Sequence, residues 1–167
     1  MKISLDTLSD EDLINFVYCE LAGKKIQENI SDFTDLKKWR KVVNEMDEPV
    51  ATVYRISILN MELLNGGLIQ YFDNSYGIFA YETLEDFKRI GANYSYKILE
   101  TCLKHLNPKN YSLDRFIELV AEREYDNYDN SFEIKLNELD DEYYDLDNEK
   151  ENLAKLLVDY LKLQIET

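Results

Sequence analysis

The sequence predicts an all-α fold: a single compact domain of about seven or eight helices around a central apolar helix at about residues 49–64. Two observations predict it. Capping residues precede apolar positions spaced three and four apart along most of the chain, and few segments alternate. The 167 residues are 45% hydrophobic and contain only five Gly and two Pro, with no repeat and no linker-like stretch. One domain over residues 1–167 is therefore expected.

Three helix starts are predicted in the first third of the chain. Ser9 is expected to cap a helix that runs to about Gln27, with acids in its first turn where the helix dipole favours them. Thr34 or Asp35 is expected to begin a shorter helix. Residues 47–49, Asp-Glu-Pro, then form a strong start, since proline suits the first helical position.

The central helix follows this third start. From Val50 to Leu64 the chain is apolar on most sides, which a helix tolerates only when other elements surround it. Asn65 and Gly66 are expected to end it in a left-handed cap, and Gly67 then lets a second short helix begin over residues 68–73.

The second half of the chain shows the same signals. Thr83 to Asp86 resembles a capping box and predicts a helix that begins there and ends near Gly91. A two-column apolar stripe over residues 98–106 predicts the next helix, and Ser112 is expected to cap another.

Two helices are expected in the last third. Apolar residues over 132–143 keep helical spacing; Phe132, Ile134 and Leu136 also fit a strand, but the longer spacing favours a helix. Apolar positions from Leu153 to Ile165 predict the final helix.

Residues for catalysis are few. His105 is the only histidine, and its place at a helix end favours a capping or surface role. Cys19 and Cys102 are too far apart for zinc spacing, and both are expected in the core. The five glycines show neither the Rossmann nor the P-loop spacing. We therefore expect no enzyme activity and no catalytic, cofactor-binding or metal-binding residues.

One calcium-loop pattern also fails. Asp145, Asp147 and Glu149 alternate as the first ligands of an EF-hand do. The sixth position, which needs glycine, is Lys150, and the twelfth, which needs a bidentate glutamate, is Leu156.

The net charge limits the classes of partner. With 34 Asp and Glu against 19 Lys and Arg the chain carries −15, so direct binding to nucleic acid or to an anionic membrane is not expected. No stretch approaches the roughly 20 apolar residues of a membrane span, and the amino terminus does not resemble a signal peptide. A cytoplasmic location is expected, and the two cysteines fit a reducing compartment.

The acids are concentrated in one segment. Residues 118–151 contain 14 acids and three bases, a balance of −11, while the rest of the chain balances at −4. Such a density of carboxylates is either a solubility device or a docking face for a basic partner, and interleaved tyrosines would add contact area or belong to the core. The candidate partner-binding residues of this acidic face are Glu118, Glu122, Glu124, Asp126, Asp129, Glu133, Glu138, Asp141, Glu142, Asp145 and Asp147.

A second feature is a polar motif inside the apolar centre of the chain. Glu62, Gln70 and Asn74 would each need a partner if they are buried. Glu62 is expected to accept hydrogen bonds from the free amides of the next helix; the alternative is a small-ligand pocket built from the three side chains. The motif residues, expected to be structural, are Glu62, Asn65, Gly66, Gly67, Gln70, Tyr71, Phe72, Asn74 and Gly77.

This motif resembles the hallmark of a bacterial family of DNA-mimic proteins with a mostly helical domain. The shared pattern is a glutamate, Asn-Gly-Gly, a bulky apolar residue, Gln, an aromatic pair, Asn and a nearby Gly. Leu68 stands where the family more often has phenylalanine. A weaker second match lies at residues 139–144, and the two together bracket about residues 47–165.

The resemblance implies an all-helical domain that occupies the DNA-binding surface of a transcription factor and so relieves repression. In this family the motif maintains the fold and the mimicking acids lie outside it, and Asp140 is expected to be structural as well. The partner expected here is therefore a basic DNA-binding protein, above all a helix-turn-helix transcription regulator. An immunity protein that neutralises a basic toxin nuclease is the alternative, beside the small-ligand pocket. The sequence leaves open whether the chain forms a homodimer.

Overall fold

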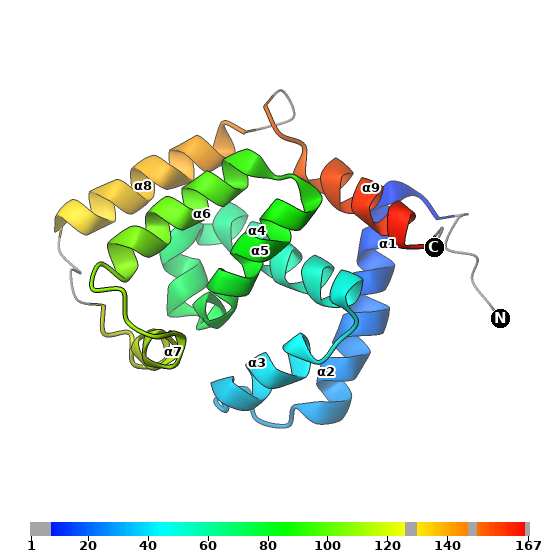
Figure 1. Cartoon of the computed structure of the whole chain (residues 1–167), viewed down its shortest axis with the longest axis horizontal. Helices are drawn as coiled ribbons and strands as arrows, with labels where there is room; N and C mark the ends of the chain where they lie inside the picture. The colour runs from blue at the N-terminus through cyan, green and yellow to red at the C-terminus, as the bar shows by residue number, and fades with distance from the viewer. Residues whose placement is uncertain (1–7, 126–129, 147–149, 166–167) are drawn as a thin grey trace.

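The computed structural model describes residues 8–125, 130–146 and 150–165, and all its regular elements in these ranges are helices (Figure 1). They form eight continuous helical segments, so the predicted all-α fold is confirmed. In chain order the elements are α1 (Asp10–Asn15), η2 (Phe16–Gly23), α2 (Lys24–Asn29), α3 (Leu36–Asn44), α4 (Glu48–Asp73), η3 (Tyr76–Phe79), α5 (Ala80–Ile90), α6 (Asn93–Leu106), α7 (Leu113–Glu122), α8 (Asn130–Tyr144) and α9 (Leu153–Ile165).

The first predicted helix is confirmed as one rod made of α1, η2 and α2. Ser9 caps it by accepting a hydrogen bond from the Asp12 amide at 3.2 Å. The middle of the rod, η2, is wound as a π-helix, which is rare in proteins. Cys102 is buried as expected, whereas the expectation for Cys19 is wrong, because its position on η2 faces solvent.

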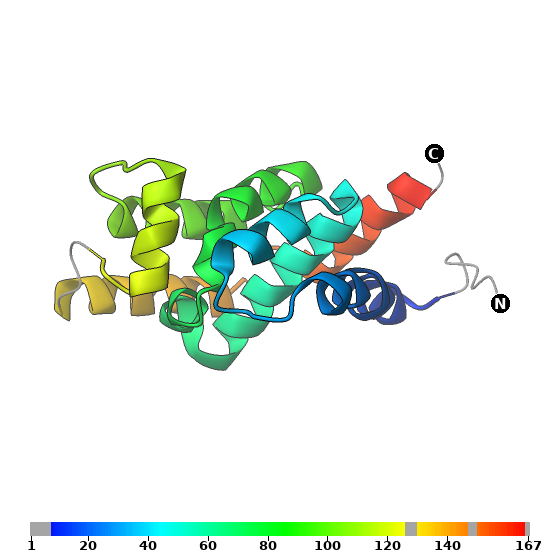
Figure 2. The ribbon, with the colours of Figure 1, turned by 90° about the horizontal axis from the view of Figure 1, so that it is seen from below.

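Helix α4 is the centre of the molecule, as predicted. It begins at Glu48 with proline in its first turn, and it packs against η2, η3, α5 and α8. Figures 1 and 2 show these elements around it. Most of its apolar side chains are buried, and Val53, Ile56 and Leu59 are at most 1% exposed, whereas Met61 and Leu64 are exposed. A helix apolar on most sides is stable here because neighbours cover most of its faces.

The break in α4 lies slightly later than predicted. Gly67, and not Asn65 or Gly66, has a positive φ, +77° with ψ of −173°, a combination that almost only glycine adopts, while Gly66 is extended at φ of −166°. A Cβ on Gly67 would lie 2.1 Å from a carboxylate oxygen of Asp140, so this position needs glycine for space as well as for its backbone. The short helix from Leu68 follows as predicted.

The predicted start of α5 at Thr83 is wrong. The helix begins at Ala80, directly after the 3₁₀ turn η3, and the Thr83 hydroxyl donates to the Phe79 carbonyl at 2.9 Å from inside the first turn. Thr83 is fully buried, so it satisfies its hydroxyl within the helix and does not cap it. Gly91 ends the helix in a left-handed cap, as predicted.

A buried ion pair joins α4 to α5. Both oxygens of Asp86, which is 0% exposed, accept from Arg55, with Nε at 2.6 Å and Nη2 at 2.9 Å. Thr52 donates to the same carboxylate at 2.9 Å, and Arg89 pairs with it from the next turn of α5. Arg55 also donates to Asn44 at 3.0 Å. Asp86 is thus a buried carboxylate with a full set of donors, which burial requires.

The later helices close the molecule. Helix α8 packs along α4 and α6, α7 packs against η3, and α9 lies beside α1 although they are at opposite ends of the chain. Lys162 of α9 pairs with Asp10 of α1 at 2.7 Å. Within the described residues, no helix has the length and apolarity needed to cross a membrane.

Candidate partner-binding surface

The predicted acidic face is divided in the structure. Glu118, Glu122 and Glu124 lie on or just after α7, whereas Glu133, Glu138, Asp141, Glu142 and Asp145 lie on or just after α8. Figure 1 shows both helices at the same end of the molecule, with α8 along its upper edge and α7 at its lower edge. Asp126, Asp129 and Asp147 lie outside the described residues. The structure therefore brings together the α8 acids and separates them from the α7 acids.

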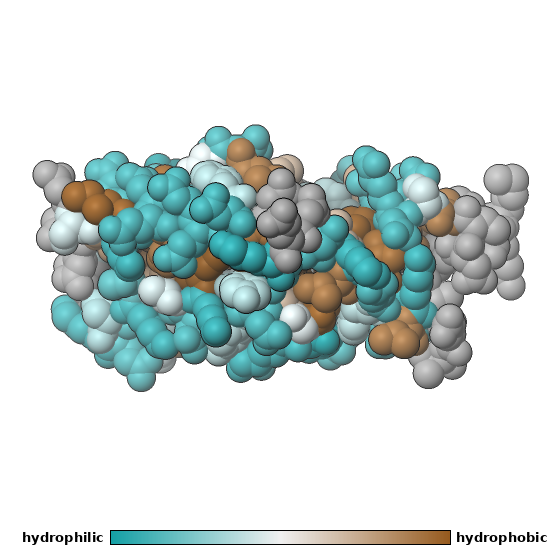
Figure 3. Space-filling model, turned by 90° about the horizontal axis from the view of Figure 1, so that it is seen from above, coloured by the Kyte–Doolittle hydropathy of each residue, from teal (hydrophilic) through white to brown (hydrophobic). Residues whose placement is uncertain are grey.

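The α8 acids form two adjacent rows. Steps of four residues define rows along a helix, so Glu133 and Asp141, two such steps apart, lie in one row, and Glu138 and Glu142, one step apart, lie in the next. All four are exposed, as is Asp145 in the turn that follows. In Figure 3 the half of the surface over α8 and α6, on the left, is mostly hydrophilic. We call these five carboxylates the α8 acidic rows.

Ion pairing differs between the two groups. On α7, Arg115 pairs with Glu118 at 3.1 Å and with Glu122 at 3.8 Å. On α8, Lys135 pairs with Glu138 at 2.9 Å. The other members of the α8 acidic rows form no ion pair with any residue that the structure describes. Four carboxylates of these rows are thus available to a partner: Glu133, Asp141, Glu142 and Asp145.

The opposite side of α8 fixes the helix to the core. Its apolar side chains Phe132, Leu136 and Leu139 are buried. The Tyr143 hydroxyl donates to the Asn60 side-chain oxygen at 2.8 Å, and the Tyr144 hydroxyl donates to the Leu63 carbonyl at 2.7 Å. Both tyrosines therefore anchor α8 to α4, while the ring of Tyr144 stays partly exposed beside the acids.

The glutamate motif holds the break in α4 together. Glu62 is 5% exposed, and one of its oxygens accepts from the Gln70 amide at 2.9 Å and from the Asn74 amide at 2.8 Å. The carboxylate thus links the long part of α4 to the short helix after the break. Gln70 is partly buried and Asn74 is exposed, so the three side chains meet without forming an enclosed pocket of their own.

Asp140 takes the role that the sequence suggested for Glu62. Its Oδ1 accepts a hydrogen bond from the Leu68 amide at 2.8 Å. This amide is at the start of the short helix, where the helix dipole stabilises a carboxylate. Burial raises the pKa of Asp140, the Leu68 hydrogen bond opposes that shift, and Asp141 adds to it. The expectation that Glu62 accepts these amides is therefore wrong, because α8 supplies the carboxylate from across the chain.

The other motif residues pack tightly. Tyr71 and Phe72 are almost fully buried, and a Cβ on Gly77 would lie 2.1 Å from the Phe72 ring. A Cβ on Gly66 would lie 2.2 Å from the Gln70 side-chain oxygen. This geometry is that of a structural cluster which joins α4, η3 and α8.

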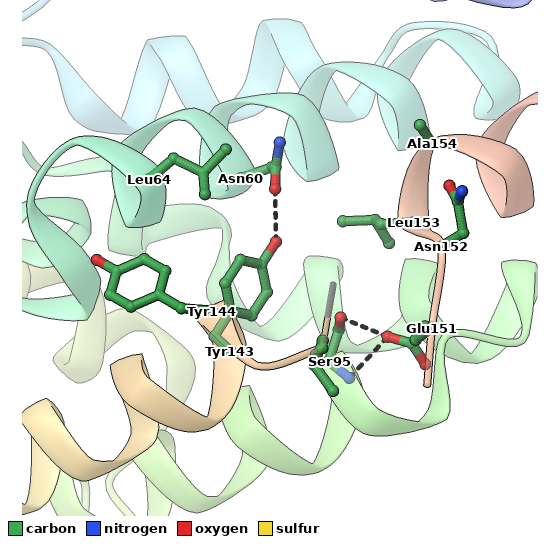
Figure 4. Close-up of a pocket in the computed structure, with 10 residues that line it drawn as sticks. Asn60, Leu64, Ser95, Tyr143, Tyr144, Glu151, Asn152, Leu153 and Ala154 are labelled. Atoms are coloured by element: carbon green, nitrogen blue, oxygen red, sulfur yellow. Dashed lines mark hydrogen bonds between the residues drawn. The ribbon is translucent and has the colours of Figure 1, made fainter. Parts of the chain in front are cut away.

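A cavity of about 450 Å³ lies where α8 ends and α9 begins (Figure 4). Tyr143 and Tyr144 line it from α8, and Glu151 lines it from the segment before α9. Glu151 accepts from the backbone amides of Tyr94 and Ser95 at 2.9 and 3.0 Å and from the Ser95 hydroxyl at 2.6 Å. It therefore caps α6 and does not belong to a free acidic surface. Among the described residues, no group of three metal-binding side chains is present here or elsewhere.

One family comparison bears on this arrangement. The sequence profile of a family described as DMP19-like protein matches residues 44–164, which include the motif, the break in α4 and the whole of α8. The chain belongs to the DMP19-like protein family. This is a family of DNA-mimic proteins, so the resemblance carried by the motif is confirmed at the level of the family. No curated protein and no solved structure matches the chain significantly. The rod formed by α1, η2 and α2 lies outside the matched region.

Proposed function

We propose that this DMP19-like protein is a DNA mimic that occupies the DNA-binding surface of a basic DNA-binding protein, such as a helix-turn-helix transcription regulator. The observation that carries the proposal is the α8 acidic rows: exposed carboxylates, most of them without an ion pair among the described residues, on a helix fixed to the core. The proposal assigns the protein a binding role and no catalytic chemistry.

The spacing of the carboxylates supports it. Glu133, Glu138, Asp141 and Glu142 lie within ten residues of α8, which corresponds to about 14 Å of helix axis. The four carboxylates define three intervals, so their mean separation along the axis is about 4.5 Å, of the same order as the roughly 3.4 Å per phosphate along one strand of duplex DNA. A partner whose Arg and Lys side chains hold phosphates can therefore pair with several of these carboxylates at once.

The rigidity of α8 supports it as well. Because Tyr143 and Tyr144 bond to α4, the acids are held in place before a partner arrives, and little side-chain and backbone order has to be gained on binding. The exposed charges would accelerate the encounter with a basic surface, and the partly exposed ring of Tyr144 would add contact area.

The first experiment is to identify the partner. The tagged protein is used to capture proteins from a lysate of its source organism, and each captured protein is challenged with duplex DNA at two salt concentrations. We expect a DNA-binding protein that duplex DNA displaces and that is released more readily at high salt. A captured regulator supports the proposal, whereas a captured nuclease whose activity the protein inhibits would replace it with the immunity function.

The second experiment tests the surface with matched variants. The triple variant Glu133→Gln, Asp141→Asn and Glu142→Gln removes three charges from α8. We expect it to bind the captured partner about 10- to 100-fold more weakly, measured by titration calorimetry at constant salt.

The control variant removes the same charge from the rod outside the matched family region. Glu11→Gln, Glu20→Gln and Glu28→Gln change three exposed acids on α1, η2 and α2. We expect it to lose less than about 3-fold, because distant exposed charges are screened. Equal losses in the two triple variants would show that only net charge matters, which contradicts a docking surface on α8.

A further inference from the structure

A second cavity, of about 620 Å³, lies on the rod side of α4 and has mainly aromatic walls. This volume is in the range of small-molecule sites. Five aromatic side chains line it, each from a different element: Tyr18 of η2, Phe33 of the segment before α3, Trp39 of α3, Tyr54 of α4 and Tyr76 of η3. We call it the aromatic cavity.

The rings of the aromatic cavity hold one another in place. Trp39 packs edge-on against Phe33 and Tyr76, with ring centroids 5.1 and 5.4 Å apart, and Tyr18 stacks on Tyr54 at 5.7 Å. The Trp39 indole N–H donates to the Tyr54 hydroxyl at 3.1 Å. The walls are thus fixed before any ligand arrives, except at the rim, where Phe33 is 52% exposed.

One buried carboxylate, that of Glu62, lies behind the wall of the aromatic cavity, whose described lining residues carry no charge of their own. No lysine or arginine is among the described residues that line it. Asn74 lines it and donates to the buried Glu62 carboxylate, whose second oxygen receives no hydrogen bond from the described residues. Burial raises the pKa of Tyr18 and Tyr76, and the nearby Glu62 charge raises both further.

Two unusual backbone segments border the aromatic cavity. Tyr18 and Cys19 belong to the π-helical segment η2, and π-helical turns are frequent at functional sites. Ser75, which also lines the cavity, has φ of +66° and is thus held in the left-handed region that non-glycine residues rarely adopt.

We propose that the aromatic cavity binds a small organic cation of the quaternary or methylated ammonium type. Aromatic rings attract such a cation through their quadrupole, and its methyl groups would contact the apolar side chains that line the cavity. The Glu62 carboxylate adds attraction from behind Asn74. The site is distinct from the α8 acidic rows, so its test does not depend on the DNA-mimic proposal.

The test uses the single tryptophan of the chain, which lies in the cavity wall. Trp39 fluorescence is recorded at constant ionic strength while choline is added, and in parallel with 3,3-dimethylbutan-1-ol, which has the shape of choline without the charge. We expect a saturable change with choline and an at least about 5-fold weaker response to the neutral alcohol. Equal binding of the two compounds, or no saturable change with choline, would overturn the proposal.

Matched variants locate the response. Phe33→Leu keeps an apolar side chain at the rim but removes the ring. Because Phe33 is 52% exposed, we expect this variant to fold. Its affinity for choline should fall about 2- to 30-fold. Tyr94→Leu removes a ring of similar exposure, 48%, outside the cavity and should leave the affinity unchanged. Tyr76→Leu, checked for folding by circular dichroism, removes an inner wall. Unchanged choline affinity in both cavity variants would contradict the assignment.

Discussion

Asp86 and Asp141 have the same side chain in opposite surroundings. Asp86 has no exposed surface, and Thr52, Arg55 and Arg89 all donate to it. Asp141 is exposed on α8 and forms no ion pair within the part of the chain that the structure describes. A carboxylate leaves water only where donors replace the water, whereas an exposed one needs no partner inside the molecule.

The comparison separates carboxylates that maintain the fold from carboxylates that are available for binding. Asp86, Glu62, Asp140 and Glu151 each accept hydrogen bonds that join two elements of the chain or two parts of one helix. Most carboxylates of the α8 acidic rows accept no such hydrogen bond from the described residues. The acidic residues of the chain therefore have two different roles, and substitutions should divide them into two classes with different effects.

Removal of the most buried carboxylate should have the largest effect. Asp86→Ala leaves the buried Arg55 guanidinium without its ion-pair partner, so we expect a loss of about 3 to 5 kcal/mol in the free energy of unfolding. Urea titration followed by circular dichroism measures it. Glu85→Ala, at the exposed neighbouring position, should cost less than about 1 kcal/mol. A difference of less than about 1 kcal/mol between the two variants would show that the pair is dispensable.

The position of Asp140 is tested through the glycine beside it. Gly67→Ala adds a methyl group at a position of positive φ and against the Asp140 carboxylate, so we expect a loss of about 3 kcal/mol in unfolding free energy. Gly91→Ala has the same φ of +77°, but its ψ of 20° lies in the left-handed helical region and the space around the Cβ is open, so only a backbone cost of about 1 kcal/mol is expected. Equal melting temperatures for the two variants would mean that Asp140 moves aside freely.

The pH dependence of stability tests the burial of Asp140 itself. Its pKa is raised in the folded protein, mainly by burial, so the folded state holds this proton at a pH where the unfolded chain has lost it. The contribution of this group to the free energy of unfolding therefore falls as the pH rises from the ordinary pKa of Asp through the raised pKa of Asp140. At higher pH the contribution stays at this lower level.

Asp140→Asn removes that titration, while its side-chain oxygen can still accept from the Leu68 amide. Wild type should gain stability relative to the variant as pH falls from about 7 toward 4, by up to about 1.4 kcal/mol for each unit by which the pKa is raised. Urea titrations at several pH values measure the difference. Parallel stability curves for the two proteins would indicate an unperturbed carboxyl group.

Local signals in the sequence predicted most of the fold. Ser9, Gly91 and Ser112 act within one turn of the chain, and each ends or begins a helix as predicted. The predicted start of α5 at Thr83 is wrong because Thr83 is buried inside the helix, and burial depends on neighbours that the local pattern does not reveal.

The sites were harder to predict because their residues come together from distant parts of the chain. Asp140 and Leu68 are 72 positions apart, and no local pattern favours Asp140 over Glu62 as the acceptor for the free amide of Leu68. The acids of residues 118–151 are adjacent in sequence, but α7 and α8 diverge, so the single predicted face is divided. The aromatic cavity could not be predicted for the same reason, since its five rings come from five separate elements between residues 18 and 76.

The smallest effect on stability is expected at the α8 acidic rows. Glu133, Asp141 and Glu142 are exposed, and their like charges repel one another along the helix. Their triple replacement by the corresponding amides should therefore leave the melting temperature unchanged or raise it by the equivalent of less than about 1 kcal/mol. Differential scanning calorimetry measures it at low and moderate salt, and the gain should shrink as salt screens the repulsion. A loss above about 1 kcal/mol would place these acids among the carboxylates that maintain the fold. With stability unchanged, any loss of partner binding in the same variant has to come from the surface itself.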